Sequence, residues 1–520
     1  MNSIFYYYRK DVVSDHRNYL NFFLAFVPLA LLLFSCKKLV ETPVPTDRIG
    51  ENAVYVNDGT AISVLNSLYS NMNGSTFQGC STQGSISFFA GLSADELTVG
   101  QAITDATVLA YYRNELTQVI QPVSGAELWA PLYNCIFRCN AAIEGLSSSS
   151  ADALTPNVRK QLLGEAKFMR AFIYFYLVNQ FGDVPLVLTT DPQTNTMLGR
   201  ATKKQIYDQM ILDLLDAEQR LSSNYLDITL LKTSLERVRP TRWGATALLA
   251  RIYLYKGDYA SAEVKATEVI NNTALYELLP NINDVFLKNS REAIWQIQPT
   301  AINFNTTEAQ ALVIPATGPS VGSYLGNPVY LSNDLLNSFE IGDNRATFGN
   351  WIDTTIYAVS DNPLVFDTVA YPYKYKLNNA DPGITNSTGT SNMNEYFMVF
   401  RLAEQYLIRA EARAQLGNTV GAKIDINSIR NRAGLPNTTA NDKSTLLDVI
   451  LNERRHELFT EWGNRWFDLK RTGKINEVMI VSTPQKSGGA VIWQPYKELY
   501  PIPLEALYTS PNLTQNPGYN

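Results

Sequence analysis

The sequence is poor in the residues and motifs on which most enzymes depend. Its 520 residues include two histidines, His16 and His456. A Ser–His–Asp or Cys–His arrangement has to use His456, because His16 lies in an expected targeting segment. The zinc-protease pattern HExxH fails as well, since Thr460 stands where the second histidine is needed. We therefore expect His456 to be one polar member of a charged helix face.

Phosphate-binding motifs are missing too. Neither GxxxxGK[ST] nor a strand followed by GxGxxG occurs. Paired carboxylates for glycoside hydrolysis leave no signature in sequence spacing, because their separation is a distance in space. Asp95-Glu96 is the most suggestive local pair, but adjacent acids more often stand at a loop or helix start. We expect no catalytic role for this pair.

Basic tracts are absent, and the formal net charge is −6. This composition disfavours a nucleic-acid partner. The four cysteines show no Cys/His spacing typical of zinc. An exported protein could form one disulfide among Cys80, Cys135 and Cys139. We favour the simpler interpretation of three small buried residues.

The chain also lacks a long hydrophobic run. The segment Phe22–Phe34 is shorter than the roughly 20 apolar residues of a membrane-spanning helix. With Arg9, Lys10 and Arg17 before it, the run suits the apolar core of a signal peptide.

The run ends in Leu33-Phe34-Ser35-Cys36. This motif resembles the lipobox of bacterial lipoproteins, although Phe34 is larger than usual. It predicts a signal peptide over residues 1–35, lipidation of Cys36 and a polar tether over 36–47. Stable anchoring requires more than one acyl chain. An ordinary secretory signal with a chance cysteine remains the alternative.

Helical patterns dominate the rest of the chain. Apolar residues recur at helical spacing in several segments, which are 57–72, 127–146, 164–182 and 206–221. The segment 164–182 is apolar nearly all round after Phe168, which predicts a helix buried between other helices.

Two segments, 239–271 and 402–432, resemble tetratricopeptide units. Small residues at matching offsets let two antiparallel helices approach closely, and a glycine, Gly257 or Gly417, makes the turn between them. The two units lie far apart in the chain, so they do not form a simple tandem array. Together they predict a mostly α fold, a helical-repeat scaffold with an irregular region packed on it.

Two further regions differ from this pattern. Residues 272–394 are rich in Asn, Thr, Gly, Pro and Tyr, and predict loops and short strands. The run Glu453–Arg471 mixes acids and arginines with tryptophans. We expect it to form an ion-pair network that joins the last helices to the scaffold, with a ligand site as the alternative.

Several of these pieces together resemble the SusD/RagB family of outer-membrane lipoproteins. The pieces are Cys36–Leu39, Glu165–Leu186, Thr241–Asp258, Arg401–Leu435, Glu453–Arg471, Tyr500–Pro503 and Gln515–Tyr519. Their order and spacing span both halves of the family architecture, with an N-terminal helical region over 48–235 and a C-terminal region over 236–520. Residues 272–394 match no family motif.

The resemblance implies a lipid-anchored protein at the cell surface of the outer membrane. Such proteins capture oligosaccharides and pass them to a SusC-like TonB-dependent transporter, and no catalytic role is implied. We expect no cofactor and assign no metal ligands. RagB-like members handle peptides, which is one alternative. A helical-barrel glycoside hydrolase is another.

Sugar capture needs flat aromatic faces and polar groups that satisfy hydroxyls. The loop regions supply both kinds of group. From residue type and loop position alone, the candidate ligand contacts are Asp95, Tyr111, Tyr112, Arg113, Tyr324, Asn327, Tyr330 and Trp351.

Overall fold

The computed structural model describes most of the chain. The described residues are 54–72, 83–100, 103–118, 126–299, 306–319, 329–359, 362–376 and 393–519. The chain separates into a unit of residues 1–53 and a unit of residues 54–520, and all described residues belong to the second. The signal peptide, Cys36, the tether, Tyr324 and Asn327 lie outside them and stay predictions, as does the proposed boundary at residue 235.

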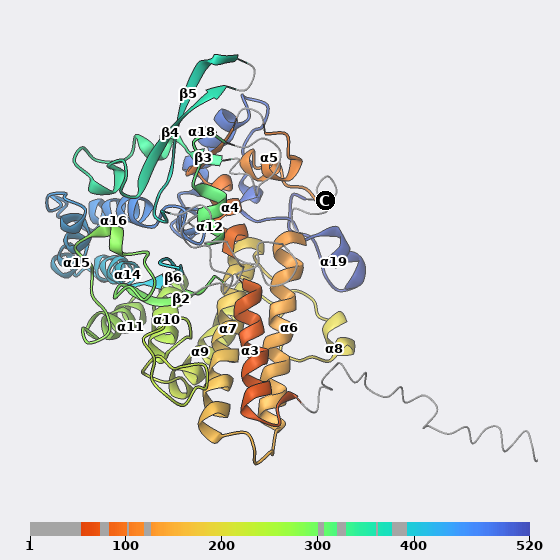
Figure 1. Ribbon diagram of the computed structural model, residues 1–520. Helices are drawn as coiled ribbons and strands as arrows, with labels where there is room; N and C mark the ends of the chain where they lie inside the picture. Colours follow the sequence, from red (N-terminus) through yellow and green to blue (C-terminus); the bar gives the residue numbers. More distant parts are fainter. Residues whose placement is uncertain are drawn as a thin grey trace, which may run out of the picture. The chain divides into compact units, whose positions relative to one another are not determined.

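The first half of the fold is a bundle of long helices (Figure 1). Its members are α3 (Asp58–Met72), α6 (Ala126–Ser148), α7 (Pro156–Phe181) and α9 (Lys203–Arg220). The helix α7 packs against the other three, and its residues from Phe168 to Phe181 are all buried. This burial confirms the prediction for segment 164–182, whose apolar residues cover the whole helix circumference.

The predicted tetratricopeptide-like units are two helix pairs. They are α10 (Arg242–Lys256) with α11 (Tyr259–Ile270), and α14 (Leu402–Gln415) with α15 (Thr419–Arg432). Gly257 and Gly417 turn the chain with φ of 80° and 83°, a region that disfavours residues with a Cβ. Asp258 and Asn418 then accept from the backbone N–H of Ser261 and Gly421 as N-caps.

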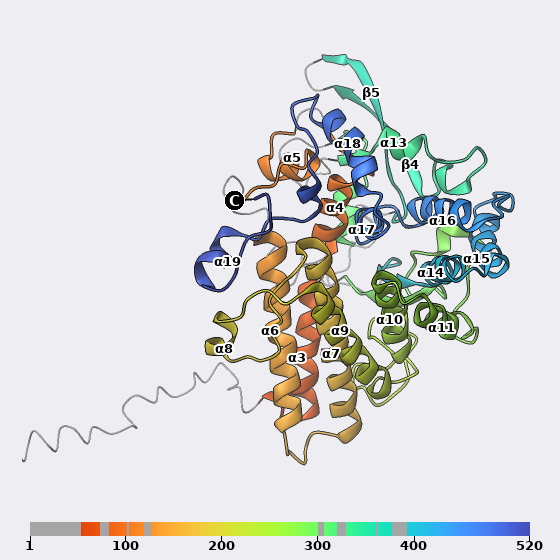
Figure 2. The ribbon, with the colours of Figure 1, turned by 180° about the vertical axis from the view of Figure 1, so that it is seen from behind.

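These two helix pairs are neighbours in space although the chain separates them. The helix α11 packs against α14, and α10 packs against α9 of the bundle. The row continues into α16 (Lys443–Leu458) (Figure 2). The scaffold is therefore a continuous superhelix of helices, and the mostly α helical-repeat fold is confirmed.

Shorter elements complete the structure. The short helices are α4 (Gln83–Ser93), α5 (Ala106–Tyr112), α8 (Pro192–Thr196), α12 (Thr307–Leu312), α13 (Asn333–Leu336), α17 (Asn464–Arg471), α18 (Ile475–Lys486) and α19 (Leu504–Thr509). Three 3-10 turns are η2 (Ile282–Asp284), η4 (Asn344–Ala346) and η7 (Pro495–Glu498).

The strands of the described segments form three separate antiparallel pairs. They are β1 (Leu97–Val99) with β3 (Val329–Leu331), β2 (Ala293–Ile297) with β6 (Phe397–Arg401), and β4 (Ile352–Val359) with β5 (Asn362–Pro372). The pair β2–β6 is buried, whereas the hairpin β4–β5 projects from the helices (Figure 1). Most of these strands come from the region 272–394, as expected.

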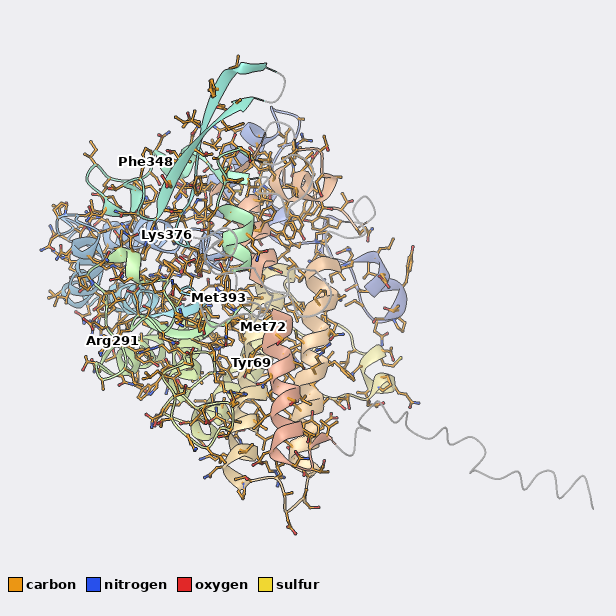
Figure 3. All side chains as sticks on the ribbon, viewed as in Figure 1. Tyr69, Met72, Arg291, Phe348, Lys376 and Met393 are labelled. Atoms are coloured by element: carbon orange, nitrogen blue, oxygen red, sulfur yellow. The ribbon has the colours of Figure 1, made fainter. Side chains whose placement is uncertain are left out.

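Aromatic side chains fill the centre of the core. Trp295 of β2 is fully buried, and its ring centroid lies 5.1 Å from that of Phe168 and 5.4 Å from that of Phe172. Tyr69 on α3 (Figure 3) reaches the same cluster and donates to Glu165 Oε2 at 2.8 Å. The bundle, β2 and the repeat helices therefore share one core.

The charged run Glu453–Arg471 forms the predicted ion-pair network. Arg401 donates to Glu461 through Nε (2.8 Å to Oε2) and Nη2 (2.8 Å to Oε1), and its Nη1 lies 2.5 Å from Glu457 Oε1 and 3.1 Å from Glu292 Oε1. Arg345 and Arg432 bind Glu457 as well. We call these six residues the Arg401 network, and all six lie inside the protein.

His456 differs from its prediction. Its side chain is fully buried instead of lying on a charged face, and it stacks on Phe339 with ring centroids 4.4 Å apart. Its Nε2 shares a hydrogen bond of 2.9 Å with Ser338 Oγ. Burial, followed by the charges of nearby arginines such as Arg345, lowers the pKa of His456 to about 2, so the ring is neutral.

The preferred interpretation of the cysteines was wrong for Cys135. Cys135 takes part in a disulfide, whereas Cys139, one helical turn further along α6, is a buried free thiol. In the part of the chain that the structure describes, no helix is both long and apolar enough to span a membrane.

Removing Arg401 tests the network. Arg401→Ala removes the partner that buried Glu292, Glu457 and Glu461 share, so we expect a loss of about 3–5 kcal/mol in the free energy of unfolding. Urea unfolding followed by tryptophan fluorescence measures it. The matched control is Arg291→Ala, because Arg291 (Figure 3) forms an exposed pair with Glu277. This variant should lose less than about 1 kcal/mol, and equal losses would contradict the assignment.

Candidate ligand-binding site

Three of the predicted ligand contacts are buried inside the protein. Tyr111 and Trp351 have no exposed surface, and Asp95 is 4% exposed. Tyr111 stacks on Phe89 with centroids 4.2 Å apart, and Trp351 donates from Nε1 to the carbonyl of Ile282 at 2.8 Å. No face of these side chains is left for a ligand, so we remove all three from the candidate site.

Asp95 has a structural role instead. Its Oδ1 accepts from Arg465 Nε at 2.7 Å, and its Oδ2 accepts from Arg465 Nη2 at 2.8 Å. Arg455 Nη2 lies 2.9 Å from the same Oδ2. Burial acts to raise the pKa of Asp95, but the two arginines outweigh it and hold that pKa far below its usual range. Asp95 therefore joins the β1 segment to α16 and α17.

Tyr112 and Tyr330 are brought together by the strand pair β1–β3. Thr98 of β1 lies opposite Tyr330 of β3 in register. The hydroxyl of Thr98 shares a hydrogen bond of 2.8 Å with the hydroxyl of Tyr112, at the end of α5. Both tyrosines are half-buried. Arg113 follows directly as the C-cap of α5, and its Nε has no hydrogen-bond partner within the described segments.

Two further residues of this site were missed in the sequence. Tyr357 of β4 and Asp367 of β5 are register partners, and the Tyr357 hydroxyl lies 3.3 Å from Asp367 Oδ2. The Tyr357 ring lies on Gly318, where an added Cβ would come within 2.3 Å of it. Only a glycine allows this contact. The signal available in the sequence was Ser360-Asp361 between two segments rich in β-branched and aromatic residues, which predicts a hairpin but leaves its register open.

Tyr112, Tyr330, Tyr357 and Asp367 form what we call the tyrosine cluster. Burial raises the pKa of Tyr330, and the nearby Tyr357, Asp367 and Tyr112 add to the shift in that order. Burial and then Asp367 likewise raise the pKa of Tyr357. The hydroxyls of Tyr330 and Tyr357 are therefore neutral, and each can donate as well as accept.

The cluster combines aromatic surface with polar groups. Each half-buried tyrosine offers an apolar ring and a hydroxyl, and Asp367 offers an acceptor for hydroxyl groups. Lys486 Nζ lies 5.4 Å from the centre of the Tyr112 ring, but it donates to the carbonyls of Leu92, Ser93 and Ala94. The arrangement suits an uncharged ligand with many hydroxyl groups.

The geometry supports a catalytic role for Asp95 and Glu96 less well than it supports ligand binding by the tyrosine cluster. Asp95 and Glu96 have pKa values pushed far apart, which is a pattern of acid–base pairs. Burial, and then Asp95, raises the pKa of Glu96 to about 8. Glu96 is 1% exposed, however, so a polysaccharide has no access to it. Across the described ranges, no group of three or more His, Cys, Asp or Glu residues could hold a metal ion.

A superhelix of helix pairs that displays a half-exposed aromatic cluster on short strands defines a helical-repeat binding protein. Two family models agree with this class. One, described as the SusD family, matches residues 353–519, and another, described as starch-binding associating with outer membrane, matches residues 87–254. Together these two matches confirm the resemblance to the SusD/RagB family that the sequence motifs predicted.

Individual relatives match most of the chain. A SusD-like protein of Formosa agariphila is 25% identical, over 96% of this chain and 98% of its own. The starch-binding protein SusD of Bacteroides thetaiotaomicron is 22% identical, over 68% of this chain and 72% of its own. A laminarin binding SusD-like protein of known structure has the same fold, with a TM-score of 0.68, 24% identity and coverage of 89% of this chain and 100% of its own.

Glu96 should make stability depend on pH. Its pKa of about 8 in the folded state lies above the usual value near 4.3, so the folded protein binds a proton that the unfolded chain releases. Stability from this group is therefore lost as the pH rises from about 4.5 to 8. Glu96→Gln does not titrate, and we expect its stability relative to wild type to increase by about 2–3 kcal/mol between pH 5.5 and pH 8.

The control for this prediction is Glu505→Gln, because Glu505 is exposed on α19. Urea unfolding of all three proteins at both pH values gives the comparison. If Glu96→Gln and Glu505→Gln show the same pH dependence, Glu96 is ionised in the folded protein and the assignment is wrong.

Proposed function

We propose that the protein captures oligosaccharides at the cell surface and passes them to a SusC-like TonB-dependent transporter in the outer membrane. The tyrosine cluster is the observation that carries this proposal. Carbohydrates present C–H faces that pack on aromatic rings and hydroxyls that need donors and acceptors. The cluster offers three half-buried tyrosines and a carboxylate within one neighbourhood.

The relatives support a carbohydrate as the ligand. The family description names starch and the outer membrane, one relative is a starch-binding protein, and one structural neighbour binds laminarin. Starch and laminarin are both neutral glucans, and the tyrosine cluster has no cation of its own. We therefore propose a neutral oligosaccharide as the ligand of this cluster.

The lipoprotein motif supports the location. A lipid on Cys36 and the polar residues 37–47 would connect the helical body to the outer membrane and leave its binding surface in reach of a transporter. Tyr324 and Asn327 immediately precede β3, which carries Tyr330. We keep both as proposed ligand contacts, together with Tyr112, Arg113 and Tyr330.

A RagB-like peptide ligand is the second candidate. The observation that favours it is Arg113, a half-buried residue that directly follows Tyr112 of the cluster, because a guanidinium can bind a carboxylate. The glycoside hydrolase is less well supported, because the suggestive pair Asp95-Glu96 is buried.

Removing a ring from the cluster tests the proposal. We expect Tyr330→Ala and Tyr357→Ala each to weaken the binding of laminarin or starch oligosaccharides about tenfold, which is about 1.4 kcal/mol and typical of a truncated aromatic anchor. Tyr330→Phe keeps the ring and should lose less than about threefold. Isothermal titration calorimetry on the purified protein measures these affinities.

Tyr508→Ala is the matched control, because Tyr508 is 80% exposed on α19, outside the cluster. It should bind as wild type does. Binding of peptides but of no glucan would favour the RagB-like alternative. Release of reducing ends from a polysaccharide, abolished by one carboxylate substitution, would show an enzyme instead.

The anchor is tested separately. Cys36→Ala removes the only thiol that the lipobox-like motif presents to the lipidation machinery, so we expect the protein to leave the membrane fraction or to keep its signal peptide. Fractionation and the mass of the mature chain give the readout. Normal processing with unchanged membrane association would refute the lipid anchor.

A further inference from the structure

A cleft of about 570 Å³ lies away from the tyrosine cluster, with which it shares no residue. It is formed by the end of α7, the start of α9, the end of α17 and the C-terminal segment around Asn516. The helices α7 and α9 are antiparallel neighbours, which places the end of one beside the start of the other. Small-molecule sites typically measure about 300–1,000 Å³, so the cleft can hold a sugar unit.

Three of the cations that line this cleft form no salt bridge with a described residue, whereas a fourth, Arg471, is paired with Glu411 and Asp468. Of the carboxylates in the described residues, none lies within 4.0 Å of a charged nitrogen of Arg200, Lys203 or Lys470. Arg200 donates from Nε to the carbonyl of Asp183 at 2.8 Å and from Nη1 to the carbonyl of Gln515 at 3.2 Å. This guanidinium is therefore held in place by the backbone and keeps its full charge.

The two lysines have unused donors. Lys470 Nζ donates to the carbonyl of Asn179 and makes no second hydrogen bond to a described residue. Lys203 Nζ lies 5.5 Å from the centre of the Tyr207 ring and donates to no described residue. Burial lowers the pKa of Lys470 to about 7; Glu498 opposes this shift, and the charge of Lys203 adds a smaller contribution to it. These properties are those of a cation that lacks a bound anion.

A second cleft differs from the first because its cations are paired with carboxylates. It measures about 500 Å³ and lies between the start of α11, α14, α16 and the end of α17. Its cations are paired, since Arg471 binds Glu411 and Lys256 lies 2.8 Å from Asp208. The first cleft therefore differs from this second one in its unpaired cations.

The first cleft also contains two acceptors. Asp183 and Glu498 line it, and Asp183 Oδ1 accepts from the backbone N–H of Lys203 at 2.7 Å. The three unpaired cations outnumber these two carboxylates by one. The balance suits a ligand with a single negative charge, and the carboxylates can accept hydroxyl donors of the same ligand.

We propose that this cleft binds a carboxylate-bearing sugar, such as a uronic acid unit, with its carboxylate between Lys203 and Lys470 and its hydroxyls toward Asp183 and Glu498. The site goes beyond the neutral-glucan function of the tyrosine cluster and does not depend on it. A plain anion would leave Glu498 and the second carboxylate oxygen of Asp183 unused, whereas a sugar acid uses both kinds of group.

Binding of sodium D-glucuronate and sodium D-galacturonate to the purified full-length protein tests the proposal. D-glucose and D-galactose are the control ligands that lack the carboxylate. Sodium acetate is the control ligand that has a carboxylate but no hydroxyl groups. We expect the uronates to bind at least tenfold more tightly than the neutral sugars and than acetate. Calorimetry and ligand-observed NMR both measure this ratio.

Lys203→Gln and Lys470→Gln should each weaken uronate binding about tenfold or more. Lys204→Gln is the matched control, because Lys204 is the next residue on α9 but pairs with Asp208 at 2.6 Å. Glutamine at position 470 retains a donor for the Asn179 carbonyl, and an unchanged thermal midpoint shows that the variant is folded. Tyr330→Ala should bind uronate as wild type does, which separates this site from the glucan site.

The proposal is overturned if glucose binds as tightly as glucuronate, or if both lysine variants bind uronate as Lys204→Gln does. If acetate binds as tightly as glucuronate, the cleft is a simple anion site and the sugar ligand is wrong. Selective binding of a peptide with a free carboxylate would likewise overturn it.

Discussion

The multidentate binding of Arg401 to Glu292, Glu457 and Glu461 is the interaction on which the rest of the structure depends. Arg401 ends β6 and begins α14, Glu292 precedes β2, and Glu457 and Glu461 flank the junction between α16 and α17. Burial works against ionising Glu457, but Arg432, Arg401 and Arg345 keep its pKa well below the usual range. Buried charges are costly unless every one is partnered, so the network permits one arrangement of these four segments.

The position of the tyrosine cluster also depends on the junction between α16 and α17. Lys374, just after β5, donates to Glu461 Oε1 at 2.6 Å and to the carbonyl of Phe459 at 2.8 Å. This contact ties the hairpin that carries Tyr357 and Asp367 to the loop before α17. Asp95 ties the β1 side to α17 through Arg465. The β4–β5 hairpin and the β1 segment are thus both attached to the buried region around α17. This attachment fixes the spacing of the tyrosines that these segments hold.

The helix α17 contains both paired charges, which stabilise the fold, and an unpaired charge that lines a cleft. Arg465 and Asp468 are buried and paired, and they hold the helix in place. Lys470 stands two residues further on and faces a cleft in which its charge is unmatched. Paired charges in this fold stabilise structure, because each carboxylate or guanidinium has its partners within the protein. The unpaired cations of the cleft remain available to bind a ligand, whereas the charges of the Arg401 network do not.

The sequence by itself determined the helical-repeat scaffold, the turns at Gly257 and Gly417, the ion-pair role of Glu453–Arg471 and the family. These features depend on periodicity, on local backbone preference and on motifs read along the chain. It did not determine which loop aromatics are exposed. Tyr111 and Trp351 are core residues, Tyr112 and Tyr330 are half-buried, and Tyr357 was missed. Only the tertiary structure decided this, because the burial of a tyrosine and the register of a hairpin depend on segments distant in the chain, such as Thr98 opposite Tyr330.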